Sequence, residues 1–179
     1  MALKAAILPV TPLQQNCSLI WDDETMLGAV VDPGGEAERI EAAVAEAGFT
    51  VEKILITHGH LDHAGAAAAL KAFYGVPVEG PHRDDAFLVS SLDRQGARFG
   101  LDAQPFEPDR WLEDGDEVTV GGLRFLVRHC PGHTPGHVIF YNEPARLAAV
   151  GDVLFQGSVG RSDLPGGDPD ALVAAIRER

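Results

Sequence analysis

The stretch ILITHGHLDHAG, residues 54–65, places three histidines and one aspartate within the six positions from His58 to His63. The whole chain holds only seven histidines in 179 residues, so this density is far above that of a random arrangement. Apolar residues precede the cluster, and a loop that follows a buried strand is where a rigid scaffold usually presents its chemistry. The stretch therefore predicts a buried strand that ends in a functional loop.

The residue types of this loop favour a metal site. Imidazole nitrogens and carboxylate oxygens are good ligands for zinc and similar divalent ions. His58 and His60 stand two residues apart where the chain leaves the strand, so their side chains can point the same way. Asp62 and His63 follow as the chain turns into a helix. We expect all four residues to take part in metal binding.

Two later positions have the same character. His133 lies in a Gly/Pro-rich loop, HCPGHTPGH at 129–137, after an apolar run. Asp152 directly follows another apolar run, AAVG at 148–151. A carboxylate at the end of a buried strand must be solvated, paired or bound to a metal. Both residues are therefore further candidate ligands.

Composition limits the class of protein. Apolar residues make up 45% of the chain, which suits one globular domain spanning residues 1–179. The net charge of −13 disfavours phosphate backbones and anionic membrane surfaces, so we expect a small-molecule substrate and neither nucleic acid nor membrane as a partner. Two cysteines are too few for a disulfide framework, and no segment reads as a signal peptide or membrane span. These features predict a cytoplasmic protein and leave its oligomeric state open.

Periodicity and turn residues predict an alternation of strands and helices. The expected strands are 3–10, 16–23, 27–33, 50–57, 76–80, a hairpin over 116–130 that turns at Gly121–Gly122, 137–142 and 146–152. The expected helices are 34–48, 63–75, a short one near 84–92, and 167–179, with a long loop over 91–109. In the last helix Asp168 is the expected N-cap, and Leu172, Val173 and Ile176 should face the core. This order indicates two β-α layers packed sheet to sheet.

Three motifs together resemble the metallo-β-lactamase superfamily: T-H-x-H-x-D-H from Thr57 to His63, C-P-G-H-T-P-G with His133, and G-D with Asp152. The resemblance covers nearly the whole chain and is strongest to short glyoxalase II-like hydrolases, which lack a separate glutathione-binding helical domain. It implies an α/β (α+β) fold, the four-layer αβ/βα sandwich. It also implies two zinc ions, with iron or manganese as alternatives. The family ligands carry over as His58, His60 and His133 for the first metal, Asp62 and His63 for the second, and Asp152 as the bridge.

One family ligand has no counterpart. A further histidine normally completes the second metal site, in a loop beyond the last predicted helix, but no histidine follows His137. The family's final strand and helix also have no counterpart. We therefore expect a C-terminally truncated domain, or else a weak second site.

The resemblance implies hydrolysis of a thioester such as S-D-lactoylglutathione by a metal-bound hydroxide. Asp62 could orient the attacking water or accept its proton. Arg161 takes the place of a basic residue that meets a glutathione carboxylate, although a pairing with Asp163 is equally compatible with the sequence. Asp32, at the end of a strand, could hydrogen-bond to a ligand histidine and orient its ring without touching the metal. It could equally be the first residue of a turn.

Other activities stay open. A persulfide dioxygenase would use a single iron on His58, His133 and Asp152, and its later loop also contains a Gly-Arg-x-Asp stretch. A lactonase, another ester or phosphodiester hydrolase, and a metal-binding module without turnover are further alternatives. The sequence does not name the metal, the acyl group or the thiol.

Overall fold

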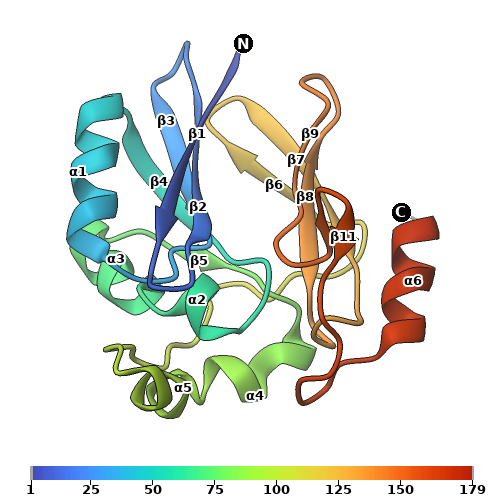
Figure 1. Cartoon of the computed structure of the whole chain (residues 1–179). Coiled ribbons are helices and arrows are strands. Elements are labelled where there is room, and N and C mark those ends of the chain that lie inside the picture. The colour runs from blue at the N-terminus through green and yellow to red at the C-terminus, as the bar shows by residue number, and fades with distance from the viewer. Residues whose placement is uncertain (1, 179) are drawn as a thin grey trace.

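Two β-sheets lie face to face in the computed structural model, which describes residues 2–178 (Figure 1). Helices α1 (Ala37–Ala47) and α3 (Ala67–Tyr74) cover the outer side of the first sheet, and helix α6 (Pro169–Glu178) lies outside the second. The order helix, sheet, sheet, helix is the four-layer αβ/βα arrangement that the sequence predicted.

The first sheet brings the candidate site to one edge. Its strands run in chain order: β1 (Leu3–Val10), β2 (Gln15–Asp22), β3 (Leu27–Val31), β4 (Thr50–Leu55) and β5 (Val78–Glu79). The first three strands are antiparallel, whereas β3, β4 and β5 are parallel and need helical crossovers. Helix α1 makes one crossover, and α2 (Leu61–Ala64) with α3 makes the next. The carboxyl ends of β3 and β4 therefore meet at one edge, which puts Asp32 beside the histidine loop.

The second sheet is wholly antiparallel. It contains β6 (Glu117–Val120), β7 (Leu123–His129), β8 (Val138–Asn142) and β9 (Leu147–Ala149). The hairpin between β6 and β7 turns at Gly121–Gly122, as predicted. A separate two-stranded ribbon, β10 (Leu154–Phe155) and β11 (Ser158–Val159), follows Asp152.

Three apolar clusters hold the layers together. One lies between the first sheet and its helices and includes Ile40 and Leu70. The second fills the space between the sheets, where Phe125 and Phe140 are its largest side chains and are almost fully buried. The third lies under α6 around Leu172. The sandwich thus depends on burial of apolar side chains from both inner faces.

The last helix matches its prediction except at one position. The Asp168 carboxylate accepts hydrogen bonds from the backbone N–H groups of Asp170 and Ala171, which is an N-cap. Leu172 is buried, but the prediction for Val173 was wrong, because its side chain is 41% exposed. Ala175 faces the core instead, since residues three apart share a helix face and adjacent residues do not.

Two other predictions fail locally. The helix expected over 63–75 is divided into α2 and α3, because the N–H of Ala66 donates to the carbonyl of Pro33 rather than continuing the helix. The loop expected over 91–109 contains helix α5 (Leu92–Phe99), which follows a 3₁₀ turn (Arg83–Asp85) and α4 (Ala86–Val89). The buried residues of helix α5 are Leu92 and Gly96. Two such residues do not form an apolar periodicity that predicts a helix from the sequence.

Within residues 2–178, no helix combines the length and the apolar character that crossing a bilayer requires.

Phe140 provides a test of the inter-sheet core. Phe140→Ala should lower the free energy of unfolding by about 3–5 kcal/mol, because it leaves a cavity between the sheets. Chemical denaturation followed by circular dichroism measures the change. Phe73→Ala is the control, since the Phe73 side chain is 63% exposed and its removal should change the stability by less than about 1 kcal/mol. Equal losses in both variants would contradict this assignment of the core.

Candidate metal centre

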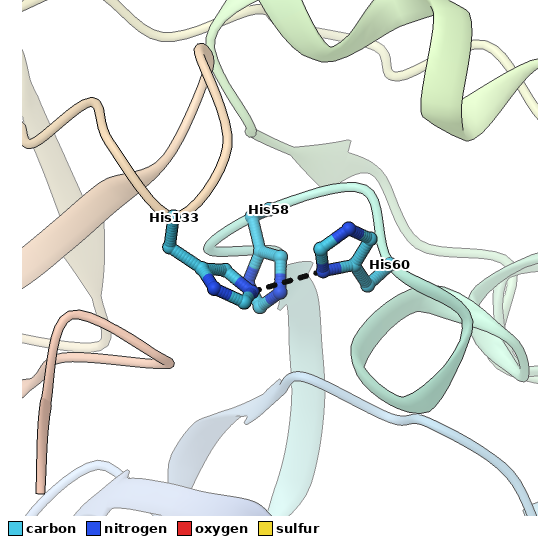
Figure 2. A group of neighbouring side chains, drawn as sticks. All are labelled: His58, His60 and His133. Carbon is cyan, nitrogen blue, oxygen red and sulfur yellow. Dashed lines mark hydrogen bonds between the residues drawn. The ribbon is translucent and has the colours of Figure 1, made fainter. Parts of the chain in front are cut away.

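Three histidines from two loops converge at the edge where the sheets meet. His58 and His60 follow β4, and His133 follows β7. Figure 2 shows their imidazole rings turned toward one another. One nitrogen from each lies within 4.8 Å of the other two. The structure therefore brings together the three residues predicted to hold the first metal.

One nitrogen of this group lacks the hydrogen-bond partner that a buried polar atom requires, and the other two have only each other. Nδ1 of His60 lies 2.9 Å from Nε2 of His133, and Nε2 of the buried His58 has no hydrogen-bond partner among the described residues. A buried nitrogen left without a partner carries a desolvation cost. A shared cation would satisfy all three nitrogens, so the geometry fits a divalent metal.

A second group overlaps the first. Ligand atoms of His58, His63 and Asp152 also lie within 4.8 Å of one another. Nε2 of His63 is 3.1 Å from one Asp152 oxygen, and Nε2 of His133 is 3.4 Å from the other. The Asp152 carboxylate thus faces both groups, which is the placement expected of a bridging ligand.

Asp62 lies beside these groups but outside both of them. Its Oδ2 atom is 3.8 Å from Nε2 of His63, and its side chain is 23% exposed. Burial raises the pKa of the Asp62 carboxyl. The structure therefore leaves two roles open for Asp62, as a ligand or as a base next to the second group.

The Asp32 carboxylate orients two of the histidines. Its Oδ2 atom accepts hydrogen bonds from the Thr57 hydroxyl at 2.7 Å and from Nδ1 of His63 at 2.9 Å. Because the Thr57 hydroxyl has only one proton, its oxygen accepts from Nδ1 of His58, 3.0 Å away. His58 is thereby held with the lone pair of Nε2 turned toward the cluster, and His63 is held with Nε2 facing Asp152.

The turn that carries Asp32 is tightly packed. A Cβ atom on Gly34 would lie 1.6 Å from the carbonyl oxygen of Asp62. Only glycine allows this approach, so the turn after β3 and the start of α2 are held in contact. The position of Asp32 relative to His63 is fixed by this packing.

Arg161 contributes through its backbone rather than its side chain. Its carbonyl oxygen accepts a hydrogen bond of 2.7 Å from Nδ1 of His133, which leaves Nε2 of that ring facing the cluster. Its exposed guanidinium donates two hydrogen bonds of 2.8 Å to the Asp163 carboxylate. The structure thus shows the Asp163 pairing that the sequence allowed.

His137 is a supporting residue whose role the sequence did not reveal. Its ring is fully buried and stacks on His58, with the ring centroids 4.6 Å apart. Nε2 of His137 accepts a hydrogen bond from the backbone N–H of Asp152. The residue therefore places the Asp152 loop against the cluster. Its location in the same Gly/Pro-rich loop as His133 was the only signal available.

The histidines of the two groups differ in their pKa values. Burial lowers the pKa of His58 well below its ordinary value, and burial together with His133 lowers the pKa of His60 to about 3. Burial also lowers the pKa of His63, but Asp32 and Asp152 outweigh it and raise that pKa to about 10. At neutral pH His58 and His60 are therefore neutral and ready to bind a metal, whereas His63 carries a proton.

This difference predicts proton release when metal binds. The raised pKa means that the pairing of charged His63 with its carboxylates stabilises the metal-free protein fully below about pH 6.5 and is lost as the pH rises through about 10. At pH 8, binding of a metal to His63 must displace its proton. Asp32→Asn should lower the pKa of His63 and reduce the number of protons released. Calorimetric metal titration in two buffers of different ionisation enthalpy measures that number.

Asp163→Asn is the control for this titration, because Asp163 is exposed and pairs with Arg161 rather than with a histidine. It should release as many protons as the wild type. Equal proton release from Asp32→Asn and the wild type would contradict the raised pKa of His63.

Solved structures of similar fold agree with this architecture. A structure titled BLEG-1 B3 metallo-beta-lactamase matches with a TM-score of 0.88 and 33% identity, over 98% of this chain and 85% of that one. The protein TTHA1623, solved in a di-iron-bound form, matches with a TM-score of 0.86 and 40% identity, over 96% of this chain and 84% of that one.

Sequence comparisons identify the family. Hydroxyacylglutathione hydrolase GloC of Haemophilus influenzae is 49% identical over 175 residues, which are 97% of this chain and 82% of that protein. The probable metallo-hydrolase YqgX of Bacillus subtilis is 35% identical, over 96% of this chain and 81% of that protein. The family model described as the metallo-beta-lactamase superfamily matches residues 10–179. The chain therefore belongs to the metallo-β-lactamase superfamily of metal-dependent hydrolases.

Proposed function

We propose that the chain hydrolyses thioesters, with S-D-lactoylglutathione or a related acyl-thiol as its substrate. The observation that carries this proposal is the pair of ligand groups that share His58, with Asp152 facing both. The 49% identity to a protein named hydroxyacylglutathione hydrolase supports the substrate class.

The donor sets fit zinc or iron. Three imidazoles, from His58, His60 and His133, would hold one ion, and His63 with the Asp152 carboxylate would hold a second beside it. Such ions supply Lewis acidity toward a carbonyl oxygen and lower the pKa of water. TTHA1623, 40% identical, was solved with two irons, which supports iron as an alternative to zinc.

The surrounding residues would place and deprotonate the reactants. Asp62, whose pKa is raised by burial, would accept the proton of the attacking water at its Oδ2 atom. The thiolate of a thioester is a good leaving group and needs little help from a general acid. Arg161, on the loop after β11, would bind a carboxylate of the thiol portion once its guanidinium leaves Asp163.

The activity can be tested directly with S-D-lactoylglutathione. Protein loaded with zinc or with iron should release glutathione, detected by a thiol-reactive chromophore, and chelation of the metal should abolish the reaction. His133→Ala should lower kcat/KM by at least about a hundredfold, because the three-histidine group loses one ligand. His82→Ala is the control, since His82 pairs with Glu113 and Asp84 outside the cluster, and it should retain activity.

Other substrates decide whether the proposal holds. The same preparations are offered a lactone, a β-lactam, a phosphodiester, and glutathione persulfide with oxygen. Oxygen consumption with the persulfide by protein holding one iron, without thioester cleavage, would overturn the proposal in favour of a dioxygenase. Faster hydrolysis of the β-lactam, lactone or phosphodiester than of the thioester would overturn the substrate class.

Arg161 can be tested separately. Arg161→Ala should raise KM for the glutathione thioester by about tenfold and leave kcat nearly unchanged, because it removes binding that is equal in ground and transition states. Asp163→Ala should lower KM, because it frees the guanidinium. Arg124→Ala is the control, since Arg124 is also exposed and paired with a carboxylate, that of Glu117. Unchanged KM in Arg161→Ala would exclude this residue from substrate binding.

A further inference from the structure

The peptide at Gly59, between two of the candidate ligands, is held on both sides by side chains from the segment that follows β5. Its N–H donates to Oδ2 of Asp85 at 2.9 Å, and its carbonyl accepts from Nε2 of Gln95 at 3.2 Å. The N–H of Leu61 donates to Oε1 of the same Gln95 at 3.0 Å. The backbone on both sides of His60 is therefore fixed by two side chains that do not belong to the ligand loop.

Asp85 also reaches the second ligand loop. The Thr134 hydroxyl donates to its Oδ2 atom at 2.8 Å, and the N–H of Gly136 donates to Oδ1 at 2.6 Å. The carboxylate is fully buried, and burial of a charge is costly unless it is satisfied by hydrogen bonds in this way. One carboxylate thus joins the loop of His58 and His60 to the loop of His133.

Close packing leaves this arrangement little freedom. A Cβ atom on Gly59 would lie 2.6 Å from Cβ of Leu88 on α4, so the ligand loop rests directly on that helix. Gln95, on α5, also donates to the carbonyl of Leu88 at 2.9 Å, which ties the two helices together. Figure 1 shows α4 and α5 crossing beneath the ends of both sheets.

We propose that Asp85 and Gln95 are positioning residues that set the spacing between His60 and His133, and thereby the metal affinity of the three-histidine group. Nδ1 of His60 and Nε2 of His133 are 2.9 Å apart, a separation that depends on two loops distant in sequence. The Asp85 side chain accepts hydrogen bonds from both loops, and Gln95 holds the backbone of the first loop at Gly59 and Leu61. The proposal rests on the proposed function, because it assumes that these histidines hold a metal.

The test compares matched variants. Asp85→Asn replaces an acceptor by a group that also carries N–H donors, which the N–H and hydroxyl donors around it cannot accommodate. Asp22→Asn makes the same change in a buried carboxylate that also accepts two backbone N–H bonds and one threonine hydroxyl bond, but away from the cluster. Both changes should lower the thermal midpoint of the metal-free protein.

A second pair changes an amide to a carboxylate. Gln95→Glu keeps the acceptor for Leu61 but loses the donor to the carbonyls of Gly59 and Leu88. Asn142→Asp, on β8, keeps an acceptor for a backbone N–H and loses a donor to the carbonyl of Arg124. Gln95 is only half-buried, so this pair decides the question if Asp85→Asn does not fold.

The readouts are zinc affinity, by competition with a chromophoric chelator, and the thermal midpoint of the metal-free protein. We expect the zinc Kd to rise about ten- to a hundredfold in Asp85→Asn and Gln95→Glu, and to stay within about threefold of the wild type in Asp22→Asn and Asn142→Asp. A merely structural role would lower the thermal midpoint in all four variants without separating their zinc affinities.

Unchanged zinc affinity in folded Asp85→Asn and Gln95→Glu overturns the positioning role and leaves the proposed function intact. An equal loss of affinity in the control variants overturns it as well, because the effect would then follow general stability. Wild-type protein that binds neither zinc nor iron overturns the proposed function itself, a result distinct from the other two.

Discussion

The hydrogen bonds of the Asp32 carboxylate are the constraint on which the rest of the site depends. Through Thr57 they fix the ring of His58, and directly they fix the ring of His63. His58 belongs to both ligand groups, so one carboxylate at the end of β3 determines which nitrogen is presented to each. The parallel pairing of β3 with β4 makes this possible, because it brings the two strand ends to the same edge.

The site combines a neutral group and a charged one within a strongly acidic chain. His58 and His60 are neutral because burial and the neighbouring histidines lower their pKa values. The neighbouring group holds a proton on His63 between two carboxylates. These environments differ although His58 contributes to both groups, and the difference comes from where Asp32 and Asp152 lie. Two metals bound here would therefore meet different electrostatic surroundings.

The sequence indicated which residues would lie together at the candidate site because most of that information is local. His58, His60 and His63 are close along the chain, and His133 and Asp152 follow apolar strands that end at the same edge. The hydrogen bonds that hold the histidine loops in place were harder to predict. Asp85 and Gln95 come from a segment with weak periodicity, and only the tertiary fold brings them to Gly59. The division between α2 and α3 likewise arises from a distant carbonyl, that of Pro33.

The candidate ligands come from both halves of the sandwich, and this has a consequence for how a metal would be acquired there. His58, His60 and His63 follow strand β4 of the first sheet, whereas His133 follows β7 and Asp152 follows β9 of the second. During synthesis the first half can offer only an open set of two or three imidazoles. A closed coordination set forms only after the second half has folded against it. A metal held by these residues would therefore be bound tightly only late in assembly, and it would act as a non-covalent cross-link that favours the completed sandwich over partly folded chains.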